Sequence, residues 1–291
     1  MTSAAVQTPS PQQGNGELQY TDADFRRIAA ILMEDAGIAL PASKSPLVYS
    51  RLAKRLRALR LKSFKEYCNF VQSDEGASER REMMTALTTN VTHFFREPHH
   101  YEELKTRVAP SLLERARRGE RIRIWSAGSS TGQEIYSVAM TLLDMEPELA
   151  KYDFKLLATD IDPKVLEKGR EGLYSNAVMA NVSDTFRSRF FKKIDGPIEP
   201  SWQIRPEVRA LVSFKELNLH RPFPMRGPFD VIFCRNVVIY FEKSMEEAVW
   251  SRFNTVLAPG GYLFVGHSER VSGPAANTLR TCGVTAYKKQ G

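Results

Sequence analysis

Cysteine is scarce in this sequence, and long apolar runs are missing. The three cysteines, Cys68, Cys234 and Cys282, are odd in number and far apart, which argues against a disulfide framework and against a clustered zinc site. No apolar run approaches membrane-spanning length, and no basic region followed by an apolar stretch opens the chain. We therefore expect a cytoplasmic protein with no secretory signal, no inserted membrane segment and no bound metal.

Acidic residues are outnumbered by basic ones. Lys and Arg total 41 against 34 Asp and Glu, so the net charge is +7. A basic protein attracts acidic partners over a distance, and both nucleic acids and acidic protein surfaces belong to that class. The charge alone does not choose between them.

Composition and periodicity divide the chain. Residues 1–16 are rich in Pro, Gln, Gly, Ser and Thr, which predicts a disordered tail. Over residues 17–85 apolar side chains such as Phe25, Ile28 and Leu32 recur at helical spacing and predict a small all-helical N-terminal domain. Residues 86–100 form a linker, and residues 101–291 form a second, larger domain.

In the larger domain, short apolar strands alternate with helices. The strands are expected at residues 122–125, 154–159, 229–234 and 261–265, and this order predicts an α/β fold with a mostly parallel sheet covered by helices on both faces. Two further strand-like runs, Trp202–Ile204 and Leu211–Phe214, flank a turn at Pro206-Glu207. They predict a small antiparallel β hairpin inserted into the domain.

The ends of the first two strands suggest a nucleoside site. Residues 126–132 form a turn of small residues around Gly128, and such a turn lets the backbone approach a ligand at the carboxyl edge of a sheet. Asp160 ends the second strand, where a carboxylate accepts hydrogen bonds from ribose hydroxyls. It would serve equally as a helix cap, but Asp162 is as well placed for that role, and we assign the cap to Asp162.

Both NAD and S-adenosylmethionine fit this arrangement. The sequence Pro259-Gly260-Gly261 follows a predicted helix end and precedes a late strand. It resembles the LxPGG turn of Rossmann-like methyltransferases, which favours S-adenosylmethionine.

A cationic helix is predicted in the N-terminal domain. The helix over residues 46–61 carries five basic side chains and no acidic one, namely Arg51, Lys54, Arg55, Arg57 and Arg60. Like charges along one helix repel. The helix is therefore either an ordinary solvated face or a docking surface for an acidic partner, and both interpretations stay open on charge alone.

Blocks along the chain resemble one family. TNVTHFFRE, WSAGSSTGQEIYS, ATDIDPKVLEKGREGLY, FCRNVVIYF and LAPGGYLFVGHSE occur in this order and are together similar to the chemotaxis-receptor glutamate O-methyltransferases, the CheR family. The resemblance spans about residues 20 to 290. It implies a Rossmann-like class I methyltransferase domain behind an all-α domain, S-adenosyl-L-methionine as methyl donor and S-adenosyl-L-homocysteine as product.

The same resemblance implies residue roles. The cofactor would be bound by Asn90, Thr92, Arg96, Gly128, Glu134, Asp160, Asn218, Leu219, Arg235 and Asn236. Tyr240 would lie near the methionine part of the cofactor. It either helps Arg96 to position the reacting groups or is only an aromatic residue at a strand end. The linker, with Arg96, would fold over the cofactor. This chain has Gln133-Glu134-Ile135 where the family often has Glu-Glu-Pro, so Glu134 is matched and its neighbours are not.

Glutamate methylation needs alignment more than acid–base chemistry. With an unperturbed pKa near ~4.3, a glutamate side chain is already an anionic nucleophile at neutral pH. Orienting it in line with the sulfonium methyl can contribute roughly 7–11 kcal/mol. Arg96, with Arg235 second, is the candidate to orient the carboxylate through paired hydrogen bonds.

The resemblance also names a partner. The cationic helix would dock on the cytoplasmic helical bundle of a chemotaxis receptor. The protein itself would be a monomer and would not insert into the membrane. A nucleic-acid methyltransferase is the first alternative, but Cys234-Arg235-Asn236-Val237 lacks the prolines typical of base amino-methylation, and aromatic and basic residues are not interleaved. The second alternative is a catalytically silent module that binds cofactor or receptor.

Overall fold

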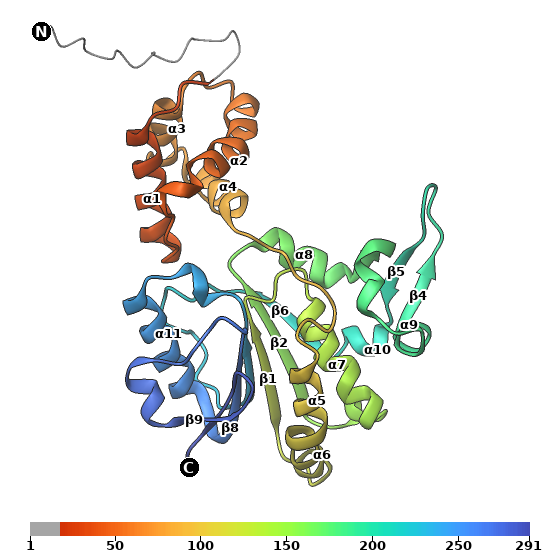
Figure 1. Cartoon of the computed structure of the whole chain (residues 1–291). Helices are drawn as coiled ribbons and strands as arrows, with labels where there is room; N and C mark the ends of the chain where they lie inside the picture. Colours follow the sequence, from red (N-terminus) through yellow and green to blue (C-terminus); the bar gives the residue numbers. More distant parts are fainter. Residues whose placement is uncertain (1–17) are drawn as a thin grey trace, which may run out of the picture. The chain divides into compact units, whose positions relative to one another are not determined.

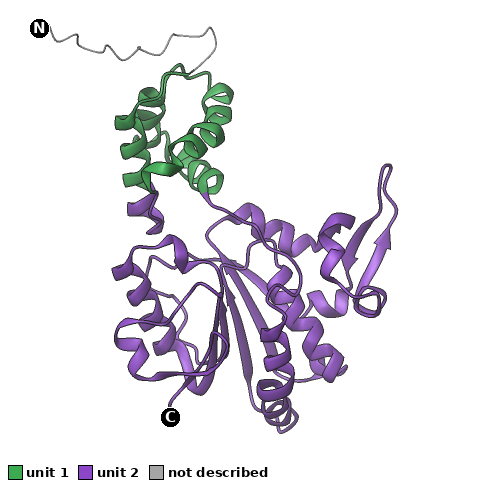
Figure 2. Cartoon of the chain, in the orientation of Figure 1, with its two compact units in different colours: residues 1–31, 41–87 green, residues 32–40, 88–291 purple. Residues whose placement is uncertain are grey.

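The computed structural model describes residues 18–291 (Figure 1). The predicted tail over residues 1–16 lies outside the described residues. The described residues form two compact units: residues 18–31 with 41–87, and residues 32–40 with 88–291 (Figure 2).

The first unit is helical, as expected. Its elements are α1 (Asp22–Ala36), whose last turn is counted with the second unit, η1 (Ala42–Lys44), α2 (Ser45–Ala58), α3 (Phe64–Val71) and α4 (Ala77–Leu87). Ile28, Leu52, Leu56, Phe64 and Met83 are fully buried. These side chains come from all four α-helices, so the helices share one apolar core.

The second unit is an α/β fold. Its helical elements are α5 (His99–Glu103), η2 (Leu104–Val108), α6 (Ala109–Arg117), α7 (Gln133–Met145), η3 (Leu149–Lys151), α8 (Pro163–Glu171), η4 (Asn176–Asn181), α9 (Asp184–Phe190), α10 (Pro206–Arg209), η5 (Val238–Tyr240), α11 (Lys243–Val256) and η6 (Gly273–Asn277). Its strands are β1 (Ile122–Ala127), β2 (Phe154–Asp160), β3 (Leu173–Ser175), β4 (Phe191–Ile194), β5 (Ser201–Ile204), β6 (Val212–Glu216), β7 (Phe229–Cys234), β8 (Leu257–Val265), β9 (Leu279–Gly283) and β10 (Ala286–Lys289).

A seven-stranded sheet runs in the order β6-β2-β1-β7-β8-β10-β9. The five strands from β6 to β8 are parallel, and β10 is antiparallel to both of its neighbours. The strand order reverses at β1, because β2 lies on one side of it and β7 on the other. Ligands of open α/β sheets bind at such a switch point, outside the carboxyl ends of the strands.

Helices cover both faces of this sheet (Figure 1). On one face Ile124 of β1 shares a buried cluster with α6 and α7. On the other face the next residue, Trp125, packs against Phe253 of α11, with their ring centroids 5.1 Å apart. The strand is therefore buried on both sides, which explains its continuous apolar character. The expected Rossmann-like fold is confirmed.

The antiparallel insertion is confirmed, but one predicted member is wrong. A separate sheet has the order β3-β5-β4, and β4 and β5 form the hairpin (Figure 1). Leu211–Phe214 does not belong to it, because β6 pairs in parallel with β2 in the main sheet. The Phe214 side chain is buried, and there is no room for side chains at Gly132 and Gly169 beside it. Residues 206–209 form the helix α10 rather than a turn.

Candidate functional site

The turn after β1 is shaped by a close contact with the loop after β7. Gly128 has φ +78°, and a Cβ there would lie 2.3 Å from Cγ2 of Val237. The backbone N–H groups of Gly128 and Ser129 both donate to the carbonyl oxygen of Thr159, at 2.8 Å. Glycine is needed at 128 both for its backbone conformation and for this contact. The carboxyl ends of β1, β2 and β7 are thereby held together.

Asp160 joins the ends of β1 and β2. Its side chain is buried; one carboxylate oxygen accepts from the backbone N–H of Ser130 at 2.8 Å, and the other from that of Asp162 at 3.0 Å. Burial raises the pKa of this carboxyl. Asp162 caps α8 by accepting from the backbone N–H of Lys164 at 2.9 Å, as predicted. Asp160 is thus left at the sheet edge and is not the helix cap.

The linker crosses the same edge of the sheet. The Asn90 amide donates to Asp162 at 3.1 Å, and the Asn90 carbonyl oxygen accepts from the Ser130 hydroxyl at 3.0 Å. Phe94 is fully buried against the rings of Tyr174 and Phe191, at centroid distances of 4.9 and 5.5 Å. The buried ring fixes the linker, and the half-buried Thr92 lies between these two attachments.

A charge cluster lies where α7 begins and β7 ends. The guanidinium of Arg235, whose side chain is 1% exposed, lies 3.1 Å from a carboxylate oxygen of Glu134 and 3.4 Å from one of Glu97. It also donates to the Arg96 carbonyl oxygen. The Ser126 hydroxyl donates to Glu134 at 2.7 Å, and burial raises the pKa of Glu134. Two carboxylates therefore face one guanidinium.

Arg96 lies next to this cluster without joining it. Its side chain is half-buried, and its Nη1 donates to the Val91 carbonyl oxygen at 3.2 Å. In the described part of the chain, no carboxylate oxygen forms an ion pair with it. The residues on either side, Phe95 and Glu97, have φ values of +53° and +57°. Such values in non-glycine residues cost about 1–3 kcal/mol each and gather at functional sites.

The remaining predicted residues lie after β6 and β7. Asn218 donates to the Asp35 carbonyl oxygen at 2.6 Å and accepts from the His220 backbone N–H at 2.9 Å. Leu219 beside it is buried. The backbone N–H of Leu217 donates to the Asp160 carbonyl oxygen at 2.9 Å, so this segment leaves the sheet next to Asp160.

Asn236 and Tyr240 belong to the loop after β7. Asn236 has φ +60°, and its side-chain oxygen is buried without a hydrogen-bond partner. The Tyr240 side chain is 37% exposed. The structure thus brings the predicted residues of the linker and of the β1, β2, β6 and β7 ends to one edge of the sheet.

Sequence reasoning missed two carboxylates at this edge. Glu97 pairs with Arg235 and also lies 3.2 Å from Nδ1 of His267. Glu269 is buried and accepts backbone hydrogen bonds from the loop after β7. Each residue ends one of the blocks that carry the family resemblance, and that position was the only available signal.

The predicted docking cations lie in the helical unit and differ in their surroundings. Arg55 makes a double hydrogen bond with the buried Glu79 and lies 3.3 Å from Glu82, both in α4. Arg51 donates to the carbonyl oxygens of residues 86 and 87 at the end of α4. These two side chains link α2 to α4. Lys54, Arg57 and Arg60 are exposed.

A group with metal-ligand chemistry adjoins the charge cluster. Among the described residues, Glu97, His99 and His100 have ligand atoms within 4.8 Å of one another. Nε2 of His100 lies 2.9 Å from the Thr285 hydroxyl, and burial together with Arg235 lowers the pKa of His100 to about 3. Because the Arg235 guanidinium already pairs with the Glu97 carboxylate, we assign no metal to this group.

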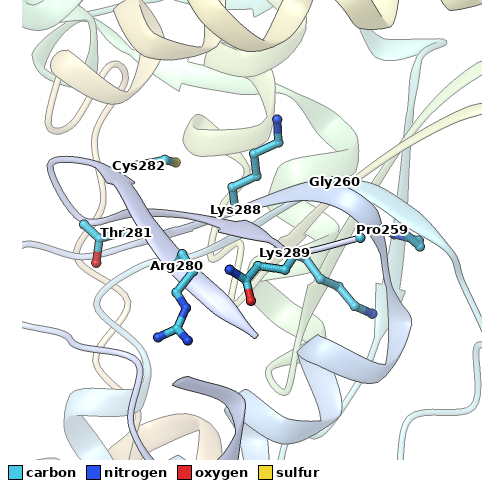
Figure 3. Close-up of a pocket in the computed structure, with 9 residues that line it drawn as sticks. Pro259, Gly260, Arg280, Thr281, Cys282, Lys288 and Lys289 are labelled. Atoms are coloured by element: carbon cyan, nitrogen blue, oxygen red, sulfur yellow. The ribbon is translucent and has the colours of Figure 1, made fainter. Parts of the chain in front are cut away.

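A basic pocket lies away from this edge. The pocket, of about 590 Å³, is lined by the early part of β8, by β9 and β10, and by Arg280, Lys288 and Lys289 (Figure 3). These three side chains extend in different directions and do not converge on one point. Lys289 donates to the carbonyl oxygens of Asn254 and Leu257, so we place no part of the site here.

Two family descriptions match the chain. "CheR methyltransferase, SAM binding domain" matches residues 90–288, and "CheR methyltransferase, all-alpha domain" matches residues 23–88. Among residues 18–291, no helix has both the length and the apolar character that a bilayer crossing requires.

Similar proteins carry one description. The chain is 50% identical over 258 residues to a "Probable chemotaxis protein methyltransferase" of Rhizobium etli, covering 89% of this chain and 96% of that protein. It is 42% identical over 269 residues to the "Chemotaxis protein methyltransferase" of Salmonella typhimurium, covering 91% and 90%. It is 41% identical over 283 residues to "Chemotaxis protein methyltransferase 2" of Pseudomonas aeruginosa, covering 96% and 98%. Neither the nucleic-acid alternative nor the silent module receives support from these matches.

Proposed function

This chain belongs to the CheR methyltransferase family, and from that premise we propose that it esterifies glutamate side chains on the cytoplasmic helical bundle of chemotaxis receptors. S-adenosylmethionine is the methyl donor of this chemotaxis methyltransferase. Beyond family membership, we propose that the acceptor is a glutamate carboxylate in the receptor's cytoplasmic bundle. We also propose that the enzyme is cytoplasmic and monomeric.

The polar groups at the sheet edge fit the cofactor. S-adenosylmethionine carries an ammonium and a sulfonium, and the cluster presents Glu134 and Glu97 against the single guanidinium of Arg235. The buried Asn236 side-chain oxygen has no partner in the described chain, and the Asp160 carboxylate lies at the position that binds ribose hydroxyls in such folds. We propose that these residues, with the predicted set from the linker and from β6, hold the cofactor.

The guanidinium of Arg96, which forms no ion pair among the described residues, is the main support for a carboxylate as the methyl acceptor. When bound, the cofactor supplies an electrophilic methyl group, and the acceptor has to reach it as an aligned anion. Arg96 has a half-buried guanidinium and no ion pair in the described chain, so it is available to hold a carboxylate by two parallel hydrogen bonds. A glutamate carboxylate is ionised at neutral pH, and proton removal by the enzyme is not required.

The proposal is tested by the lability of the product. Purified protein is incubated with methyl-labelled S-adenosylmethionine and receptor-containing membranes, and volatile label is measured after mild base. Carboxyl methyl esters release methanol, whereas methyl groups on nitrogen do not. Receptor-dependent methanol is expected. Stable label on the receptor, or no label while cofactor binding is intact by calorimetry, would remove glutamate esterification.

Lys54 and Arg57 are the better docking candidates on α2. Both side chains are exposed, whereas Arg55 is paired with Glu79 inside the helical unit. Because the receptor surface is expected to be acidic, we predict that Lys54→Glu with Arg57→Glu raises the KM for receptor about 10-fold, with unchanged kcat and cofactor affinity, and that added salt shrinks the difference.

The matched control is Lys215→Glu, an exposed lysine on β6 of the α/β unit. Combined with Arg280→Glu, at an exposed arginine of β9, it reverses one lysine and one arginine outside α2, and we expect the receptor KM of this double control to equal that of the wild type. Equal rises in KM for control and α2 variants would mean that general attraction, and not α2, guides the encounter. Arg55→Glu is unsuitable here, because it would leave the buried Glu79 without its cation and destabilise the unit.

A further inference from the structure

We propose that Glu269 is a positioning residue that holds the loop after β7 in the shape needed to bind S-adenosylmethionine. The inference rests on the assignment of Arg235 and Asn236 to the cofactor site. It does not depend on which acceptor is methylated.

The Glu269 carboxylate binds four backbone N–H groups. One oxygen accepts from Val237 and from Val238, each at 2.9 Å, and the other accepts from Asn236 at 2.8 Å and from Gly266 at 2.6 Å. The residue is only 3% exposed. Consecutive N–H groups that point into one concavity form an anion-binding nest, and here a side chain of the protein itself fills the nest.

The loop that is held in this way carries the predicted site. Asn236 adopts φ +60°, a left-handed conformation that an isolated asparagine occupies only part of the time. Arg235 precedes it in the charge cluster, and the Val237 side chain lies against Gly128 in the turn after β1. Glu269 therefore fixes the backbone from which the Asn236 side chain projects, together with the spacing between the β1 and β7 ends.

Gly266 shows independently how closely these groups approach. A Cβ at residue 266 would lie 2.6 Å from Nδ2 of Asn236, 2.7 Å from a Glu269 carboxylate oxygen and 2.8 Å from the Asn236 backbone nitrogen. One of these distances involves backbone, which cannot move aside like a flexible side-chain end. Alanine at 266 would displace the same loop without changing the carboxylate.

Two substitutions of Glu269 distinguish the role of its two acceptor oxygens from the role of its size. Each Glu269 oxygen accepts two N–H groups. In glutamine one of these positions becomes an NH2 donor, which faces two N–H donors whichever way the amide is turned. Aspartate keeps both acceptor oxygens on a side chain one methylene shorter. Glutamine, although nearly the same size as glutamate, is therefore the more damaging replacement.

The test measures binding of S-adenosylhomocysteine by calorimetry, together with the melting temperature, for Glu269→Gln, Glu269→Asp and Gly266→Ala. Binding is measured at a temperature at which each variant is folded. We expect Glu269→Gln and Gly266→Ala to raise the Kd at least about 10-fold, and Glu269→Asp to raise it less than glutamine does. The control Glu207→Gln changes an exposed carboxylate on α10 and should leave the Kd unchanged.

Two results would overturn the inference. In the first, Glu269→Gln and Gly266→Ala bind S-adenosylhomocysteine with a Kd within twofold of the wild type, although their melting temperatures fall. Glu269 would then act on stability alone. The other is tighter binding by the glutamine variant than by the aspartate variant. If Glu269→Gln does not fold, Gly266→Ala and Glu269→Asp still decide between the two roles. Binding of the product needs no receptor, so failure of the esterification assay leaves this test intact.

Discussion

Arg235→Met should lower the free energy of unfolding of the α/β unit by about 3–5 kcal/mol, as expected when one partner of a buried ion pair is removed. The guanidinium is 1% exposed and pairs with Glu134 and Glu97. Methionine fills similar space but leaves two carboxylates, each only 12% exposed, without the guanidinium that lies between them. The loss is measured by chemical denaturation, as the change in unfolding free energy extrapolated to water.

The uncompensated charge, and not the lost volume, should account for most of this effect. Adding Glu97→Gln and Glu134→Gln to Arg235→Met removes both charges, and we expect the triple variant to regain more than half of the loss. Arg280→Met, at an exposed arginine of β9, controls for the loss of one arginine. A loss below about 1 kcal/mol for Arg235→Met would contradict a stabilising role for the cluster and would resemble an exposed pair.

The main sheet could be predicted because its signals are local. Strand ends, the turn around Gly128 and Asp160 all lie within short segments of sequence. The turn predicted at Pro259-Gly260-Gly261 is wrong, because these residues lie inside β8, where the pairing with β7 is irregular. The placement of Leu211–Phe214 could not be predicted in this way. A short apolar run fits the inserted antiparallel sheet and the main parallel sheet equally well. Leu211–Phe214 joins the main sheet because Phe214 packs where Gly132 and Gly169 leave space.

The segment 32–40 illustrates a second limit. Its apolar pattern continues that of α1, yet it is counted with the α/β unit. Ile38 forms a β-bridge with Phe241, and the Ala39 backbone N–H donates to the Tyr240 carbonyl oxygen at 2.8 Å. These contacts join residues some two hundred positions apart, and no periodicity within either segment indicates them.

Partners of charged groups were the least predictable part of the site. The blocks of functional residues can be recognised in the sequence. Nothing in the sequence indicates that Arg235 lies between Glu97 and Glu134, or that Glu269 binds the backbone N–H groups of the loop after β7. In the helical unit, Arg55 has its carboxylate partner in another helix. A helix with no acidic residue of its own therefore still has part of its charge compensated.

Arg96→Ala should lower kcat about 100-fold at saturating concentrations of both substrates, a loss of the size that misalignment of reacting groups produces. Arg235 is enclosed in the charge cluster, whereas the Arg96 guanidinium has one hydrogen-bond partner within residues 18–291, the Val91 carbonyl oxygen. Between the two candidates, only Arg96 can turn toward an incoming carboxylate without breaking a buried ion pair.

Substitution by lysine distinguishes orientation from charge. Lysine retains the cation but cannot form two parallel hydrogen bonds to a carboxylate, so we expect Arg96→Lys to recover less than one tenth of the lost turnover. Turnover is measured as receptor-dependent methanol release. If the alanine variant regains full turnover when the S-adenosylmethionine concentration is raised, Arg96 binds only the cofactor. An arginine held too firmly by the acceptor would stabilise the ground state and slow transfer, and a single hydrogen bond to a backbone carbonyl leaves Arg96 able to bind and then release the esterified, neutral side chain.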